Sequence, residues 1–307
     1  MNSVSMDVCA IGMHRQNGKD EMTMMKKLLA LLLALVAVAT FSACKKEEDE
    51  KISNLEAFRQ QDVVYTSYTD PDTKAVFSFE SVDTDTVKIT GYTGPTEMHD
   101  VKIPATVQTG ADAATSTKKV IAVGAEAFKA ISSIKNVIIP EGIETIEKYA
   151  FADCVQMASV SIPASIKTIE EGAFRNNGIA TLVFPETCGL TEIAPSAFSR
   201  CFNLKELTVP AYIKTIGVGA FFECTSLEKL ILSEGVETVG NQAFQGTTAL
   251  AHLDLPSTFK NTDPLEDLAF SGSDVLYREN IKCPADSAAE DYANRMVLSD
   301  PEDNTQA

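Results

Sequence analysis

The sequence predicts a mainly β solenoid of about six to seven coils, each of about 23 residues. Two series of residues that keep the same phase predict it. An Ala-Phe dipeptide recurs at Phe128, Phe151, Phe174, Phe198, Phe221, Phe244 and Phe270, at intervals of 23, 23, 24, 23, 23 and 26 residues. The second series is Pro140, Pro163, Pro185, Pro210, Ser233 and Pro256. One such coil cannot bury its apolar residues alone, so an array of stacked coils is expected.

The composition limits the classes of function. The 307 residues include 26 Lys and Arg against 43 Asp and Glu, a net charge of −17, and no run of Lys or Arg exceeds two residues. Nucleic-acid binding depends on neutralising phosphates with basic residues, so we expect no nucleic-acid partner. The seven cysteines include no C-x-x-C pair, which leaves a zinc site without support, and we expect no cofactor or metal.

The first 43 residues have the pattern of a targeting segment. Lys26 and Lys27 precede an apolar run at residues 28–41, which is short for a bilayer span but suits the core of a signal peptide. We therefore assign residues 25–43 to a signal peptide, with the start at Met24 or Met25. Residues 1–24 are assigned to an upstream extension.

Cys44 follows this segment, and the run Phe41-Ser42-Ala43-Cys44 resembles the lipobox of bacterial lipoproteins. In that family the Cys is acylated and becomes the mature N-terminus. Phe41 stands where the motif usually has Leu. The resemblance implies that a lipid on Cys44 anchors the protein to a membrane. The alternative is an ordinary secretory signal followed by an incidental Cys.

Residues 44–60 predict a disordered tether, because Lys45 and Lys46 are followed by an acidic run at residues 47–50. An acidic run directly behind a lipid-bearing Cys resembles the surface-export signal of some outer-membrane lipoproteins. This resemblance implies a lipid-anchored protein of the bacterial outer membrane, at the cell surface. Whether it faces the periplasm or the outside stays open.

Residues 210–232 show what one coil contains. Leu227, Leu230 and Leu232 follow an L-x-x-L-x-L pattern that ends with period 2, which predicts a short strand. The Pro that follows such a segment cannot donate to a strand ladder and marks the strand end. A second apolar pair, Ile213 and Ile216, predicts a short extended segment on the opposite wall. The Ala-Phe corner then places Phe in the interior.

These marks, L-x-x-L-x-[ILV]-P, I-x-x-I and G-x-x-A-F-x-x-C, resemble the BspA-like class of bacterial leucine-rich repeats over residues 120–285. The resemblance implies a leucine-rich repeat solenoid with capped ends. Residues 77–94 resemble the N-terminal β cap of that class, so residues 61–119 are assigned to a cap and a loop, with 104–119 as a surface loop. Residues 281–284, with Asp291 and Tyr292, resemble its closing segment, and residues 286–307 are assigned to a C-terminal cap and tail.

Three cysteines, Cys154, Cys201 and Cys224, lie three residues after a repeat Phe. The plainer interpretation is a small buried thiol that fills one position of the coil. Cys201 and Cys224 are expected in adjacent coils, with Cα atoms ~5 Å apart, so a disulfide between them is the alternative. We do not expect these cysteines to be catalytic.

Two pairs of polar residues also resemble sites. His252 and Asp254 alternate along one strand, but the equivalent positions of the preceding unit hold Lys229 and Ile231, so no nucleophile is placed beside them. Asp83 and Asp85 are better explained by a hairpin turn than by a calcium loop, whose Gly and distal Glu are missing. We therefore predict that the protein is not an enzyme.

The face of the predicted sheet remains as the place for function. Outward residues of successive strands should stack in two columns. One column holds Asn136, Ser159, Thr181, Glu206, Lys229 and His252, and the other holds Ile138, Ser161, Val183, Thr208, Ile231 and Asp254. Half of the second column is β-branched and apolar. Strand propensity alone explains this, or it indicates a partner-binding strip.

The function predicted by these features is protein–protein interaction or adhesion, without catalysis, by a lipid-anchored envelope protein. The BspA-like resemblance implies surface interaction with a host or microbial protein, and the identity of that ligand stays open. The alternative is a structural spacer of the envelope that has no specific ligand.

Overall fold

A computed structural model describes residues 66–95, 99–110, 116–261 and 268–297. All of them belong to one compact unit, Val63–Ala307. The predicted upstream extension, the signal peptide, the lipid-bearing Cys44 and the acidic tether at residues 44–60 lie outside the described residues.

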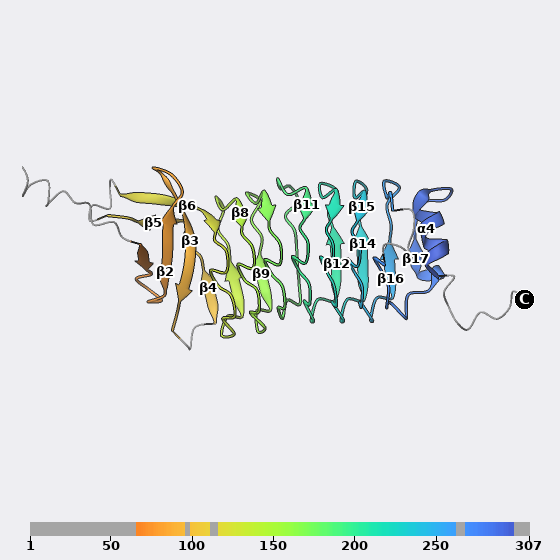
Figure 1. The fold of residues 1–307 in the computed structure, drawn as a ribbon, viewed down its shortest axis with the longest axis horizontal. Helices are drawn as coiled ribbons and strands as arrows, with labels where there is room; N and C mark the ends of the chain where they lie inside the picture. The colour runs from red at the N-terminus through yellow and green to blue at the C-terminus, as the bar shows by residue number, and fades with distance from the viewer. Residues whose placement is uncertain (1–65, 96–98, 111–115, 262–267, 298–307) are drawn as a thin grey trace, which may run out of the picture. The chain divides into compact units, whose positions relative to one another are not determined.

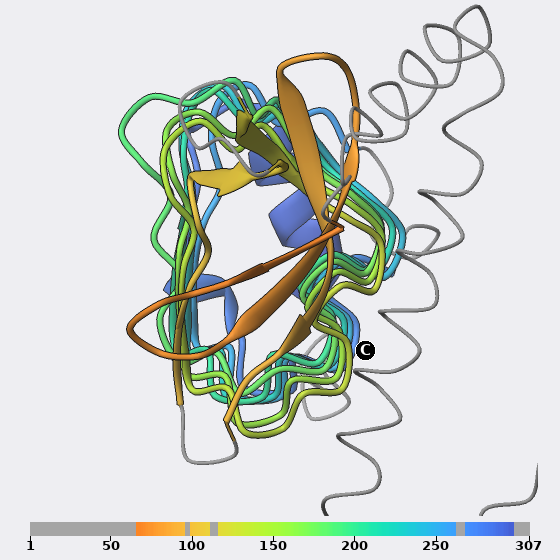
Figure 2. The ribbon, with the colours of Figure 1, turned by 90° about the vertical axis from the view of Figure 1, so that its left-hand side faces the viewer.

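The described coils stack in a row, and their strands form two walls (Figure 1). We call the first wall the long-strand face. It consists of β4 (Asp100–Lys102), β7 (Asn136–Ile138), β9 (Ser159–Ser161), β12 (Glu206–Val209), β14 (Lys229–Leu232), β16 (His252–Asp254) and β17 (Ile281–Lys282). Seen along the stack, successive coils overlie one another around a common outline (Figure 2). The prediction of a leucine-rich repeat solenoid is confirmed.

The opposite wall, the short-strand wall, carries the second apolar pair of each coil. It consists of β6 (Thr117–Val123), β8 (Thr145–Ile146), β10 (Thr168–Ile169), β11 (Glu192–Ile193), β13 (Thr215–Ile216) and β15 (Thr238–Val239). Apart from β6, each of these strands has two residues, one pointing inward. The apolar pair, spaced by three residues, therefore supports only a two-residue strand that ends at its second member.

The repeat Phe residues form the interior column that joins the coils. The rings from Phe128 to Phe270 stack nearly parallel, with centroids 4.8–5.4 Å apart and interplanar angles of 16° or less. Tyr92 extends the column at one end and Tyr292 meets Phe270 edge-on at the other. All of the repeat Phe rings are buried. Their regular spacing keeps every coil in the same register at this corner.

An antiparallel meander precedes the coils. It consists of β1 (Ser67–Thr69), β2 (Val76–Ser81) and β3 (Thr86–Thr93), and β3 pairs in parallel with β6 of the first coil. The turn at Asp83 joins β2 to β3, as predicted, and the Asp83 carboxylate accepts hydrogen bonds from the amides of Asp85 and Thr86. The assignment of residues 61–119 to the cap of the BspA-like class stays a prediction.

The prediction of a surface loop at residues 104–119 is wrong for its described part. β5 (Thr106–Gln108) pairs antiparallel with the start of β6, so this segment contains a hairpin. Val107 is buried while its neighbours in β5 are exposed, which is the alternation of a half-buried strand. The Ala- and Thr-rich composition hid this alternation.

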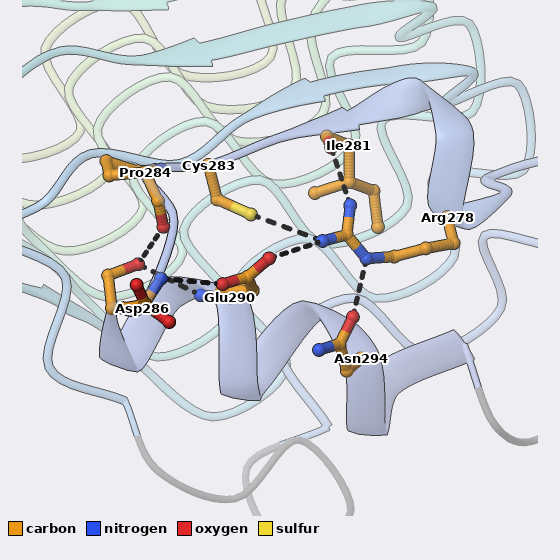
Figure 3. Close-up of polar contacts among 8 residues, drawn as sticks. Arg278, Ile281, Cys283, Pro284, Asp286, Glu290 and Asn294 are labelled. Atoms are coloured by element: carbon orange, nitrogen blue, oxygen red, sulfur yellow. Dashed lines mark hydrogen bonds and ion pairs between the residues drawn. The ribbon is translucent and has the colours of Figure 1, made fainter.

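The last coil is covered by η1 (Arg278–Asn280), β17 and α4 (Ala288–Val297) (Figure 1). Arg278 bonds to the Ile281 carbonyl oxygen and to Asn294 Oδ1, and it lies 3.5 Å from Glu290 Oε1 (Figure 3). The Glu290 amide donates to Ser287 Oγ, and Glu290 Oε2 accepts from the Asp286 amide. These contacts fix the start of α4 and hold it to the strand end. Tyr292 then packs edge-on against Phe259.

Candidate functional site

The structure places the predicted strip on the long-strand face. Strand pairing puts Asn136 beside Ser159 and Ile138 beside Ser161, and a single bridge joins Ser159 to Thr181. Further along, Glu206, Lys229 and His252 are in register, as are Thr208, Ile231 and Asp254. The pairing therefore aligns the predicted columns within β7–β9 and within β12–β16, and it is interrupted between Thr181 and Glu206. Their role in binding stays a prediction.

The two halves of the long-strand face differ in chemistry. Around β9 and the following coil, the outward residues are Ala158, Ser159, Ser161, Thr181 and Val183, none of which is charged. Val183 is 68% exposed, and Ile138 is 50% exposed at the same half of the face. An exposed branched aliphatic side chain favours contact with a partner.

From β12 onward the outward residues of this face carry charges of both signs. They are Lys205, Glu206, Glu228, Lys229, His252, Asp254 and Lys282. Lys229, Ile231, His252 and Asp254 are half-buried and alternate with buried residues along their strands. His252 Nε2 lies 2.9 Å from Asp254 Oδ1, a contact that becomes an ion pair when the imidazole is protonated.

The long-strand face is interrupted between Thr181 and β12. At four other junctions, two consecutive amides donate to one carbonyl oxygen of the preceding coil. Lys135 and Asn136 donate to His99, Ala158 and Ser159 to Lys135, Glu228 and Lys229 to Lys205, and Ala251 and His252 to Glu228, over 2.7–3.3 Å. Within the described residues, the equivalent amides of Lys205 and Glu206 have no acceptor, and no backbone hydrogen bond joins residues 180–184 to 205–209.

The cause of the interruption is visible in the sequence of the coil at residues 174–197. In the neighbouring coils, the next inward residue lies three positions after the Cys: Met157 follows Cys154, and Leu204 follows Cys201. In this coil Ile179 lies only two positions after Asn177. The strand segment of this coil therefore starts one residue early. Two extra residues follow Pro185, so that the Pro-to-Pro intervals are 22 and then 25 residues. Strand pairing needs a matched register, which this coil lacks on its C-terminal side.

The short-strand wall is divided at the same coil, since β10 and β11 belong to different sheets. Side chains replace part of the missing backbone pairing. The Cys188 thiol donates to the Ile166 carbonyl oxygen at 2.8 Å, and the Tyr212 hydroxyl donates to the Pro185 carbonyl oxygen at 2.8 Å. Burial raises the pKa of Tyr212 to about 12, so the hydroxyl stays protonated as a donor. At the Phe corner, the amide of Phe174 still bonds to Ala197.

A hollow of about 590 Å³ opens on the long-strand face at the interruption. Its residues are Ala158, Gly178, Ala180 and Thr181 on one side and Asn203, Lys205, Glu206 and Ser226 on the other. The hollow exists because Ala158 and Ala180 occupy positions that hold Lys135 and Lys205 in neighbouring coils. A Cβ on Gly178 would lie 2.6 Å from the Val155 carbonyl oxygen, so only Gly fits there. Sequence reasoning missed this hollow, although the shortened Asn177-to-Ile179 spacing was its signal.

The cysteines are buried thiols, as the plainer interpretation predicted. Cys154, Cys201 and Cys224 are fully buried and free, so the alternative disulfide is not formed in the structure. Burial raises the pKa of Cys154 to about 11, and burial together with the neighbouring Cys224 raises the pKa of Cys201. A thiol with a raised pKa is a poor nucleophile at neutral pH.

The part of the chain that the structure describes contains no group of three or more His, Cys, Asp or Glu side chains that could hold a metal ion. In the same residues, no helix has the length and apolar character needed to span a membrane.

Taken together, the coils, the Phe column and the two strand walls define a leucine-rich repeat protein. The sequence model described as BspA type Leucine rich repeat region matches six copies within residues 108–211 and 191–284, more than half of the chain. The protein therefore belongs to the BspA-type leucine-rich repeat family. Such repeats form scaffolds that generally mediate protein–protein interaction.

Solved structures agree with this assignment. The chain is similar to a leucine-rich repeat protein from Bacteroides ovatus, with 28% identity over 68% of this chain and a TM-score of 0.59. It spans 52% of that protein, about half its length. It is also similar to the T. pallidum leucine-rich repeat protein TpLRR, with 26% identity and a TM-score of 0.56. That similarity covers 69% of this chain and 92% of that chain. No curated protein matches the sequence.

Proposed function

We propose that the protein is a non-enzymatic, lipid-anchored component of the bacterial cell envelope whose long-strand face binds a protein ligand. The observation that carries the proposal is the composition of that face. It presents Val183 and Ile138 to solvent, and the charged side chains from Lys205 onward lie beside an uncharged field. Apolar contacts ringed by polar groups are the usual anatomy of a protein interface.

The opposite wall supports the choice of face. On the short-strand wall, lysines pair with glutamates of the adjacent coil, as in Lys167 with Glu144 and Lys148 with Glu171. On the long-strand face, Lys205, Lys229 and Lys282 form no ion pair with any described residue. These lysines are available to a partner, whereas those of the other wall already join coil to coil.

Anchoring rests on the sequence features at residues 25–50. A lipid on Cys44, followed by the acidic tether, supports a place in the outer membrane with the solenoid at the cell surface and a host or microbial protein as ligand. Labelling of cells with a radioactive fatty acid tests the anchor. The full chain should take up label, and Cys44→Ser should not. Equal labelling of both would remove the lipid anchor from the proposal.

A capture experiment tests the binding face. Immobilised protein of residues 45–307 is compared with a face variant, Thr208→Asp with Ile231→Asp, and with a control, Thr168→Asp with Thr238→Asp. Thr168 and Thr238 are exposed on the short-strand wall. The face variant should lose the captured ligand while the control keeps it, with all three proteins folded by circular dichroism. Equal capture by the face variant would reject the face, and a protein that captures nothing specific would favour the envelope spacer.

A further inference from the structure

The interrupted junction of the long-strand face carries an inference about what the partner presents. At four other described junctions of this face, two consecutive amides donate to one main-chain carbonyl oxygen of the preceding coil, and at the junction before the interruption Ala180 donates to Ala158. Lys205 and Glu206 hold the same pair of amides, and within the described residues neither finds an acceptor. Lys205 and Glu206 are exposed, so water can pair with these two amides, and an oxygen of a ligand can take the place of that water.

The direction of the donors is set by the strand. Alternate residues of a parallel strand bond to opposite neighbours. The carbonyl oxygens of Lys205 and Val209 accept from the next coil, so the N–H and C=O groups of Glu206 and Thr208 point toward the preceding coil. Lys205 lies just before the strand, and its equivalent, Glu228, donates to the preceding coil although its own carbonyl oxygen accepts from the next coil, so we expect the Lys205 amide to point toward the preceding coil as well. That is the side on which Glu206 and Lys205 line the hollow.

The hollow limits the kind of group that enters it. None of its lining residues is aromatic, which disfavours a flat ring, because pockets for such ligands are lined mainly by hydrophobic and aromatic side chains. Its floor of Ala158, Gly178 and Ala180 is small and uncharged. The donors at its wall are the two amides, the hydroxyls of Thr181 and Ser226 and the ammonium of Lys205, while the Glu206 carboxylate also lines the hollow. Because that carboxylate repels negative charge, the set favours a neutral oxygen acceptor over an anion.

The spacing of the coils at the Phe corner disfavours insertion of a whole strand between them. The ring centroids of Phe174 and Phe198 are 5.2 Å apart, the same as for Phe151 and Phe174. Since hydrogen-bonded strands lie ~4.7–4.9 Å apart, an added strand between the coils would need about twice this separation. A ligand can therefore lie across the face and direct one oxygen to the amides, but it cannot complete the sheet.

We propose that the hollow at Ala180, Lys205 and Glu206 is the docking point for an extended peptide segment of a protein partner. A main-chain carbonyl oxygen of that segment takes the place of the missing coil carbonyl and accepts from the Lys205 and Glu206 amides. Val183 contacts an adjacent apolar side chain of the same segment. The inference rests on the proposed function and specifies the part of the long-strand face that recognises the ligand.

The test uses a phage-displayed library of random peptides, selected on the full chain without its targeting segment, residues 45–307. A selected peptide is then measured against two variants by fluorescence anisotropy. Ala180→Gln fills the hollow. Ala251→Gln is its matched control, because Ala251 is exposed at the equivalent repeat position two coils away from Glu206, and its amide donates normally to Glu228.

We expect Ala180→Gln to raise the Kd about tenfold or more and Ala251→Gln to leave it within about twofold. Circular dichroism melting should be alike for both variants, which separates loss of binding from loss of fold. Equal binding of the peptide to all three proteins, or failure of the library to yield a peptide, would overturn the inference. Those outcomes are distinguishable from failure of the proposed function, which is judged by capture with the Thr208→Asp, Ile231→Asp variant. If the Thr208→Asp, Ile231→Asp variant loses the captured ligand but Ala180→Gln binds the peptide as wild type does, the proposed function stands and the docking point is rejected.

Discussion

At the scale of single residues, four side chains that lie three positions after a repeat Phe bond to the coil before it: Cys154, Asn177, Cys201 and Cys224. Cys154 Sγ lies 3.0 Å from the Phe128 carbonyl oxygen, and Cys224 Sγ lies 3.3 Å from that of Phe198. Asn177 makes the equivalent bond to Phe151 at 3.1 Å. These side chains are donors in an inter-coil ladder, a role that the interpretation as space-filling thiols did not include. Cys and Asn can alternate in this position because both supply a donor of similar reach.

Cys154→Ala should lower the free energy of unfolding by about 1–2 kcal/mol, because it removes a donor and leaves a small void. Cys154→Ser should cost less, since the hydroxyl can donate to the same carbonyl. Urea denaturation measures both. The control is Val155→Ala at the exposed neighbouring position, which should stay within about 0.5 kcal/mol of wild type. A loss for Cys154→Ser equal to that for Cys154→Ala would mean that the thiol only fills space.

The raised thiol pKa values predict a loss of stability in alkali. Burial raises the pKa of Cys154 to about 11, above its ordinary value of 9.0, so the folded chain holds a proton that the unfolded chain releases. The stabilisation is complete below pH 9.0 and declines as the pH rises toward about 11, with a slope of up to ~1.4 kcal/mol per pH unit from this group. Urea midpoints across this range should fall less steeply for Cys154→Ala than for wild type. Parallel curves for the two proteins would rule out the contribution of this thiol.

At the scale of elements, α4 depends on its first turn. Ser287 accepts from the Glu290 amide at 3.2 Å, and the Glu290 carboxylate accepts from the Asp286 amide at 2.7 Å (Figure 3). This is a variant of a capping box in which the Glu reaches the amide one residue before the capping Ser. The helix covers the last coil through Tyr292, which is buried. The cap therefore stabilises the C-terminal end of the whole stack.

Ser287→Ala should lower the free energy of unfolding by about 1 kcal/mol, because the Glu290 amide loses its side-chain acceptor and keeps only the Ser287 carbonyl oxygen. Thermal melting followed by circular dichroism measures the change. Ser132→Ala, at an exposed position, is the control and should be neutral within about 0.5 kcal/mol. If both substitutions are neutral, α4 is held by Tyr292 and Arg278 alone.

Elements inside the repeat were predictable from the sequence, and elements outside it were not. The Phe column and the strand positions could be predicted because a fixed interval of about 23 residues repeats each physical requirement. β5 and α4 occur once each and lie outside the repeat. Ser287 and Glu290 form a capping signal for α4, but this signal occurs once and is not part of the repeat. The hollow could not be predicted in full, because it depends on which hydrogen bonds survive the shortened spacing after Asn177.

At the scale of the whole molecule, the stack should behave as a sum of coils and of the interfaces between them. Val209 and Leu232 are register partners, so deletion of residues 210–232 would join Val209 to Ser233 in a position that matches the native chain. Phe198 would then stack on Phe244. The deletion also removes the hydrogen bond from the Tyr212 hydroxyl to Pro185.

Deletion of residues 210–232 should therefore leave a folded protein that melts cooperatively, a few degrees below wild type because one interface is lost. Deletion of residues 222–232 is the control, because it removes half a coil and breaks the register of every later Phe. Circular dichroism and size-exclusion chromatography compare the two. Loss of fold in both would show that the coils are not interchangeable units.

The long-strand face, interrupted before β12, should leave the Lys205 and Glu206 amides open to a ligand. Residue-resolved hydrogen exchange by NMR on the free protein is the decisive measurement. The Glu228 and Lys229 amides, which donate to Lys205 at 2.7 and 3.2 Å, are the internal reference, since the same two positions recur one coil later. We predict fast exchange at Lys205 and Glu206 and slow exchange at Glu228 and Lys229. Equal protection of the two pairs would show that the face is continuous and that its amides are already paired.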